Sequence, residues 1–143
     1  MLKDYQEQLD LPIHKLLQEN NTRWWSILLM FTSLQENKEA LTLTFADKDK
    51  SNIMLSTDNW KHINLLIKLF EPFKIAVEML GSEKNVSISL IIAVFQILKD
   101  LLAAKSSDTK IITKMQEHML TKIKNRYSND QIKFLKPCTL LDV

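Results

Sequence analysis

The stretch NWKHINLLIKLFEPFKIAVEML, residues 59–80, decides the fold class of this 143-residue chain. Its apolar residues recur at intervals of three and four, which is the repeat of one face of an α-helix. That face comprises Ile63, Leu66, Ile67, Phe70, Phe73, Ala76, Val77 and Leu80. We expect Leu66, Phe70 and Phe73 to be buried. Pro72 lacks a backbone N–H, so we expect it to kink the helix or split it near Phe70.

Both ends of this segment carry signals of a helix boundary. Ser56, Thr57 and Asp58 precede it, and these residue types are favoured at the start of a helix. Gly81 is the only glycine in the chain, and it stands where a left-handed residue would end the helix. The sequence therefore predicts one long helix with a capped start and a glycine at its end.

The rest of the chain carries the same helical period. One glycine and three prolines leave little turn chemistry for β-hairpins. Further helices are predicted at residues 3–9, at 22–32 with Thr22 as the cap, and at 109–127. Residues 37–45 continue or restart the second of these, and another helix starts at Ser87 or Ser89 and runs to about residue 105. Extended chain is predicted at residues 14–21 and 132–143, and an exposed loop at 46–52. The predicted fold class is mostly α, a helical bundle-like unit with short extended segments near the ends, organised as a single domain over residues 1–143.

Composition excludes several classes of protein. Apolar residues make up 45% of the chain and charged residues 25%, which is ordinary for a soluble globular domain. The net charge of +2 is too small to indicate nucleic-acid binding by itself. The longest apolar run, residues 90–95, is far shorter than the roughly 18 residues of a membrane span, and the first ten residues do not resemble a signal peptide. We therefore expect a soluble intracellular protein without a membrane partner.

No arrangement of residues in the sequence indicates catalysis. The three histidines have no metal-ligand spacing, and neither a G-x-G-x-x-G motif nor a P-loop is present. Cys138 lies in an apolar stretch and is interpreted as a buried structural thiol. Asp58, Asp108 and Asp130 stand at helix starts or turns, where capping explains them. We therefore expect no enzyme activity, no metal, no cofactor and no small-molecule substrate.

Residues 22–25, Thr-Arg-Trp-Trp, hold two of the three tryptophans of the chain. Free amides and the positive end of the dipole at a helix start favour phosphate. Arg23 would add a charged fork and Trp24 a stacking surface, so the pair could hold an unstacked nucleotide. The alternative is that Trp24 and Trp25 belong to the core and that Arg23 caps or pairs. From the residues alone, both interpretations stay open.

The last third of the chain is mildly basic. From Lys110 onward there are seven basic residues against three acidic ones. Lys110, Lys114 and Lys124 could share one side of a helix, and such a side attracts phosphate. The alternative interpretation is an ordinary solvated helix face.

Three blocks, in order, resemble hAT-family transposases and the BED zinc-finger proteins derived from them. In the first block, residues 11–41, Thr22-Arg23-Trp24-Trp25-Ser26 is similar to the family's T-R-W-N-S, which precedes a Met-Leu helix. In the second block, residues 59–92, a tryptophan opens a helix and Phe70-Glu71-Pro72-Phe73 is similar to the family's Leu-x-Pro-Phe. The third block, CTLLDV, resembles the family's Leu-Leu-Asp-Pro-Arg strand.

The resemblance implies an RNase H-like catalytic core, with three metal-binding acids, that a large helical insertion interrupts. This chain resembles part of that insertion, and the family's catalytic acids belong to blocks outside it. Trp24 corresponds to the family tryptophan that stacks on a flipped base near the transposon end, and Arg23 is its neighbour. The sequence departs from the family at Trp25, which replaces an asparagine, and at residues 83–87, which replace a Tyr-Pro-Thr turn.

The expected function is that of a non-catalytic fragment or domesticated remnant of a hAT-type transposase. It would be nuclear and would bind DNA weakly through Arg23 and Trp24. The alternative is a protein-interaction or dimerisation module with no nucleic-acid role, which would bind a partner or a second copy through exposed apolar surface.

Overall fold

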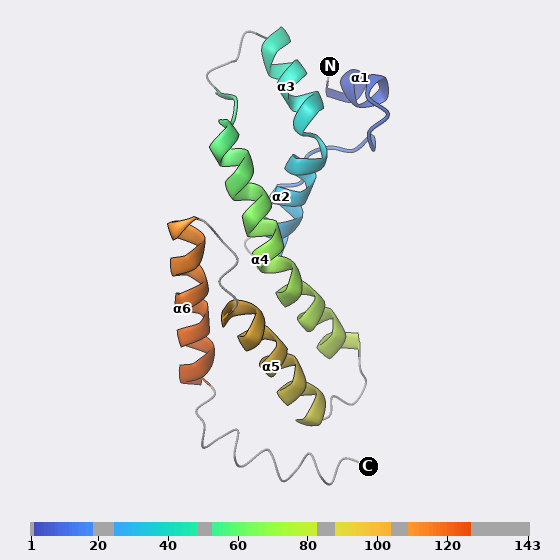
Figure 1. The fold of residues 1–143 in the computed structure, drawn as a ribbon. Helices are drawn as coiled ribbons and strands as arrows, with labels where there is room; N and C mark the ends of the chain where they lie inside the picture. Colours follow the sequence, from blue (N-terminus) through green and yellow to red (C-terminus); the bar gives the residue numbers. More distant parts are fainter. Residues whose placement is uncertain (1, 19–24, 49–52, 83–87, 104–108, 127–143) are drawn as a thin grey trace. The chain divides into compact units, whose positions relative to one another are not determined.

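The structure is a computed structural model, and it describes residues 2–18, 25–48, 53–82, 88–103 and 109–126. Within these ranges the chain forms helices and no strand (Figure 1). The helices are α1 (Leu2–Gln8), α2 (Ser26–Glu36), α3 (Lys38–Asp47), α4 (Thr57–Ser82), α5 (Ile88–Ala103) and α6 (Lys110–Arg126). The predicted mostly-α class is confirmed. Of the segments predicted to be extended, residues 14–18 carry no regular secondary structure, and residues 132–143 lie outside the described ranges.

The chain divides into two compact units, Met1–Glu71 and Pro72–Val143, called unit 1 and unit 2 below. The boundary falls inside α4, at the proline that was expected to kink or split this helix. The predicted split is wrong, because α4 continues unbroken through Pro72 to Ser82. One proline removes one backbone donor, whereas the turns on both sides of it keep their own hydrogen bonds. That residues 1–143 form a single domain stays a prediction.

The start of α4 is capped as its sequence predicts, but its end is not. The Ser56 hydroxyl accepts the backbone N–H of Asn59 at 3.2 Å, and the Ser56 carbonyl accepts that of Trp60 at 3.1 Å. Gly81 lies inside the helix and does not have a positive φ, so the prediction of a left-handed glycine cap is wrong. The helix ends one residue later, at Ser82.

The buried face of α4 differs in detail from the predicted one. Ile63 and Ala76 are buried as expected, and so is Leu69, which the three-and-four pattern omits. The predicted core residues Leu66, Phe70 and Phe73 are only half-buried, and Val77 is exposed. A single apolar stripe does not describe the helix, because its first half packs within unit 1 and its second half within unit 2.

In unit 1, α1 lies beside α3 (Figure 1) and ends in a left-handed turn. Asp10 has a φ of 53°, the Leu11 N–H bonds the Gln6 carbonyl at 2.8 Å, and the Asp10 N–H bonds the Glu7 carbonyl at 3.3 Å. This is the Schellman pattern, in which two carbonyls of the last turn find partners. Aspartate tolerates this conformation better than most residues with a Cβ. After this turn the chain continues into residues 11–18.

Two buried amide side chains connect this N-terminal segment to the junction of α2 and α3. Asn37 separates these helices and is 0% exposed, while Gln6 on α1 is 1% exposed. The Gln6 amide donates to the Asn37 side-chain oxygen and, at 3.0 Å, to the His14 carbonyl. The Asn37 amide donates to the Ser33 carbonyl at 2.8 Å, and the Ser33 hydroxyl accepts the Leu17 N–H at 3.4 Å. This amide network fixes both α1 and residues 11–18 against α2.

Unit 2 contains the end of α4 together with α5 and α6. Each of these helices runs in the direction opposite to the one before it (Figure 1). Its core is formed by Ala76, Val94 and Leu98, with Phe73, Leu80 and Leu90 packed against them. Ile112 on α6 is also buried. Nowhere in the described ranges is a helix both long enough and apolar enough to span a membrane.

We expect Asn37→Ala to lower the free energy of unfolding by about 1–3 kcal/mol, because it removes a partner from the buried Gln6 amide. Urea denaturation would measure the loss. Thr121→Ala is a matched control, since it removes an exposed hydroxyl that bonds only to the Glu117 carbonyl of its own helix. It should change stability by no more than about 0.5 kcal/mol. Equal losses in the two variants would contradict a special role for the amide network.

Gly81→Ala should stabilise the chain by about 0.5–1 kcal/mol, because alanine is the better helix former and restricts the unfolded chain. No atom lies within 4 Å of a Cβ built at this position, so the methyl group meets no obstacle. Thermal denaturation followed by circular dichroism would measure the change. A loss of stability would show that Gly81 needs a left-handed backbone after all.

Candidate functional site

The nucleic-acid contact predicted at Arg23 and Trp24 lies outside the described residues and stays a prediction. The structure does describe Trp25, which occupies the N-cap position of α2. Its side chain is half-buried and makes no capping hydrogen bond, while its carbonyl accepts the Leu29 N–H at 3.1 Å. Because α2 begins at Ser26, this helix starts later than the predicted cap at Thr22 implies.

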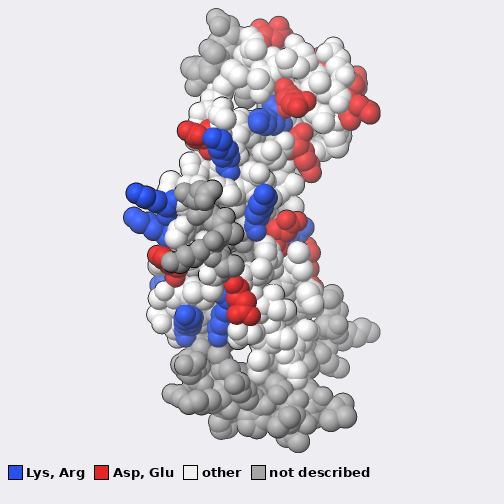
Figure 2. Space-filling model, in the orientation of Figure 1, with Lys and Arg blue, Asp and Glu red and all other residues white. Residues whose placement is uncertain are grey.

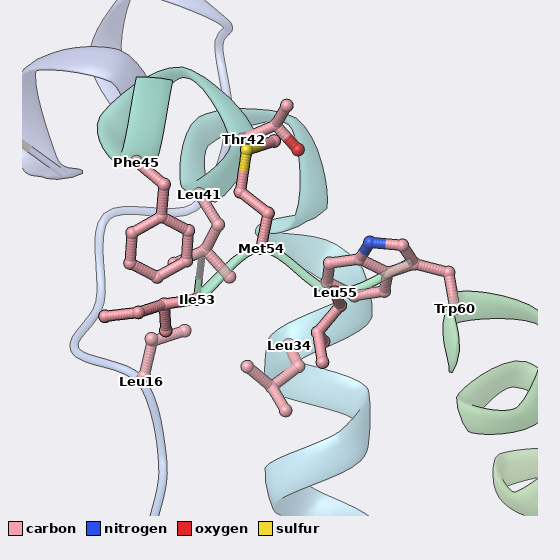
Figure 3. A pocket seen from close by; sticks show the side chains of 9 residues that line it. All are labelled: Leu16, Leu34, Leu41, Thr42, Phe45, Ile53, Met54, Leu55 and Trp60. Carbon is pink, nitrogen blue, oxygen red and sulfur yellow. The ribbon is translucent and has the colours of Figure 1, made fainter. Parts of the chain in front are cut away.

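Unit 1 contains an apolar pocket of about 260 Å³, which the sequence did not indicate (Figure 3). It is lined by Leu16, Leu34, Leu41, Thr42, Phe45, Ile53, Met54, Leu55 and Trp60. Thr42 is the one hydroxyl-bearing residue of this lining, and its hydroxyl donates to the Lys38 carbonyl at 2.8 Å. The side chains therefore favour an apolar guest. Of the residues that line the pocket, only the apolar triplet at 53–55 could have been recognised from the local sequence.

The pocket has one firm side and one side open to solvent. Leu41 on α3 is buried, and the Leu17–Ser33 hydrogen bond fixes the backbone next to Leu16. Another wall consists of residues 53–55, whose side chains are all exposed, Ile53 at 54%. Figure 3 shows Met54 between the Phe45 side of the pocket and the Trp60 side. A guest would cover apolar surface that water contacts in this structure.

A positive charge lies at the edge of the pocket. The Lys38 ammonium is 5.6 Å from the centre of the Trp60 ring, within the range of a cation–π interaction. Lys38 precedes Thr42 by one turn of α3, so the two share one side of that helix. The ion pairs found between described residues do not include Lys38. The pocket thus combines an apolar interior with a cation beside it.

Other candidate residues contribute no site in the described part of the chain. There, no three His, Cys, Asp or Glu side chains come together in a way that could hold a metal ion. The His14 ring lies 3.4 Å from the Glu36 carboxylate, which ties residues 11–18 to α2. Asp58, predicted to cap a helix, lies in the first turn of α4 and pairs with Lys61 at 3.4 Å. Asp108, Asp130 and Cys138 lie outside the described residues.

Sequence comparison finds similarity to the zinc finger BED domain-containing protein DAYSLEEPER of Arabidopsis thaliana. The two are 27% identical over an alignment of 142 residues, and the match covers 97% of this chain and 20% of that protein. The chain thus spans about a fifth of the length of the curated relative it matches. Neither a family model nor a solved structure matches the chain. The similarity supports the resemblance to BED zinc-finger proteins noted in the sequence.

Proposed function

We propose that this chain is a non-catalytic helical part of a hAT-transposase-derived, BED-type protein, with a DNA contact at Arg23 and Trp24. The observation that carries the proposal is the similarity to a BED zinc-finger protein across 97% of the chain. A match of this extent includes the first two resembling blocks, residues 11–41 and 59–92. A nuclear location and the RNase H-like context of the longer protein are part of the same proposal. So is the absence of catalysis, since the resemblance assigns the catalytic acids to other blocks.

The start of α2 gives this DNA contact a physical basis. Arg23 and Trp24 come directly before Trp25, which occupies the N-cap position of α2. The positive end of a helix dipole attracts phosphate, and an arginine next to it adds a fixed charge. A tryptophan stacks on any unpaired base, with a gain of roughly 1–3 kcal/mol. We therefore propose that this site binds an unstacked nucleotide and its phosphate.

Trp24→Ala should weaken the binding of hairpin or single-stranded DNA by about 1–3 kcal/mol and leave the fold intact. A variant with Trp25→Phe and Trp60→Phe isolates the fluorescence of Trp24, which DNA should quench at low salt. Trp60→Phe alone is the control. Trp60 lines the pocket of unit 1 and not the proposed DNA contact, so this variant should bind DNA as the unmodified chain does. If Trp24→Ala unfolds the chain, or if no DNA binding is measurable at low salt, the proposed contact is wrong.

A second candidate function, protein interaction, is favoured by the pocket of unit 1. Its open wall exposes Ile53, Met54 and Leu55, and Lys38 supplies a charge at the edge. The complementary partner is an amphipathic helix that places a leucine in the pocket and a glutamate near Lys38. Such a helix-in-groove contact buries apolar surface at the centre and keeps the charged pair at the rim.

The test is a helical peptide that carries leucine and glutamate four residues apart on one face. In a variant with Trp24→Phe and Trp25→Phe, its binding should shift the fluorescence of Trp60. Met54→Ser should weaken binding about threefold to sixfold, since full burial of a methionine is worth roughly 1.5–3 kcal/mol and a guest would cover the 37% of Met54 that is exposed. Lys38→Gln should weaken the glutamate peptide but not its glutamine analogue, whereas Lys110→Gln should affect neither. An unchanged affinity in Met54→Ser would exclude the pocket.

A further inference from the structure

Helix α6 turns a strongly basic face toward solvent. Basic side chains occupy every fourth position of it, and a further one, Lys124, points to the other side of its last turns. All of them are exposed: Lys110, Lys114, His118, Lys122, Lys124 and Arg126. Figure 2 shows the blue Lys and Arg side chains over the part of the surface that α6 forms. Glu117 is the one acidic residue of the helix. The three lysines expected to share one side of this helix, Lys110, Lys114 and Lys124, are all exposed.

The core of unit 2 fixes the orientation of this face. On the opposite side of α6, Ile112 is 3% exposed and Gln116 is also buried. Rotating the helix would expose Ile112, so the lysines cannot turn inward without a loss of apolar burial. Side chains four positions apart on a helix lie about 5–6 Å from one another. From Lys110 to Arg126 the row is about 24 Å long at a rise of about 1.5 Å per residue.

The charge on this face is large relative to the whole chain. Five Lys or Arg against one Glu give α6 a net charge of +4, whereas the chain has +2 in total. All residues outside α6 therefore sum to −2. The ion pairs between described residues neutralise Lys3, Lys61 and Lys74, but none of them includes a residue of α6. The total net charge conceals a concentrated basic surface.

The chemistry of this face fits a regular polyanion. Double-stranded DNA carries one negative charge per roughly 1.7 Å of its axis, which is dense enough to meet every cation of the row. Single strands are usually bound on aromatic stacking platforms, and residues 110–126 contain no Phe, Tyr or Trp. A lipid surface is held by an amphipathic helix with a free apolar face, but Ile112 and Gln116 lie in the core. Ile111 is the one large apolar side chain of α6 that is exposed among the described residues.

We propose that the exposed face of α6 is a docking surface for the phosphate backbone of double-stranded DNA. This inference rests on the proposed function for the identity of the polymer, but it concerns residues other than Arg23 and Trp24. Phosphate contacts hold and orient a duplex without reading its sequence. The face would therefore bind duplexes of any sequence, and Arg23 and Trp24 would act on an unpaired base.

The test measures how salt affects the binding of a fluorescently labelled 20-base-pair duplex to the full 143-residue chain. If the four Lys and Arg of the row contact phosphates, the logarithm of the affinity falls with the logarithm of salt at a slope of about −3.6. Between 50 and 200 mM salt, this slope means a loss of about 150-fold in affinity. The triple variant Lys110→Gln, Lys114→Gln and Lys122→Gln should reduce the slope to about −0.9 and the loss to about 3.5-fold.

A matched control removes three lysines elsewhere. The variant Lys3→Gln, Lys61→Gln and Lys74→Gln loses the same charge, but these lysines pair with carboxylates in the structure. Its slope should equal that of the unmodified chain. If both triple variants lower the slope equally, only net charge matters and the proposal is wrong. Glutamine is nearly as good a helix former as lysine, and circular dichroism verifies the fold. Should the α6 triple variant lose helix, Lys114→Gln alone must still lower the slope by about 0.9.

Two further measurements distinguish this inference from the alternatives, a contact at Trp24 alone and binding to a lipid surface. Trp24→Ala should leave the duplex slope unchanged while it weakens hairpin binding. If Trp24→Ala abolishes duplex binding and the α6 triple variant does not, the inference fails and the proposed function stands. If only the α6 variant has an effect, the inference stands and the proposed contact at Trp24 fails. Vesicles of phosphatidylserine and phosphatidylcholine should not bind, and α6-dependent binding to them without duplex binding would overturn the proposal.

Discussion

The pairing of two buried amides, Gln6 and Asn37, is the constraint on which unit 1 depends. A primary amide moved from water into an apolar interior costs several kcal/mol unless its hydrogen bonds are replaced. Here the Gln6 amide donates to the Asn37 side-chain oxygen and to the His14 carbonyl, and the Asn37 amide donates to the Ser33 carbonyl. The pair can therefore be buried only if α1, residues 11–18 and the junction of α2 and α3 come together in one arrangement. That arrangement also places Leu16 at the pocket.

Unit 2 is organised by apolar burial instead. Small and branched side chains on α4 and α5 form its core, and Ile112 holds α6 in one rotation. The basic residues follow from that rotation, because whatever faces away from the core faces solvent. Apolar burial is incomplete on α5, where Ile97 remains 58% exposed. The same core thus produces both a charged surface on α6 and an apolar one on α5.

The two DNA contacts proposed for this chain are argued by separate routes. The similarity concerns nearly the whole chain, and the resemblance assigns DNA contact to Arg23 and Trp24. The basic face of α6 is an argument from charge and orientation, and only the identity of its polyanion depends on the proposed function. The pocket beside Lys38 and Trp60 belongs to neither route, since an apolar cavity with one cation suits a protein side chain better than a phosphate.

The sequence by itself determined what depends on neighbours within about four residues. The helical period of residues 59–80, the cap at Ser56 and the spacing of Lys110 and Lys114 are local, and the structure contains all three. Only the tertiary structure decided the partners of groups far apart in the chain. Gln6 and Asn37 are 31 residues apart, and each alone is an ordinary polar residue. The burial of Leu69, the helical backbone of Gly81 and the pocket also depend on packing, because local propensities are worth less than about 1 kcal/mol per residue and tertiary contacts override them.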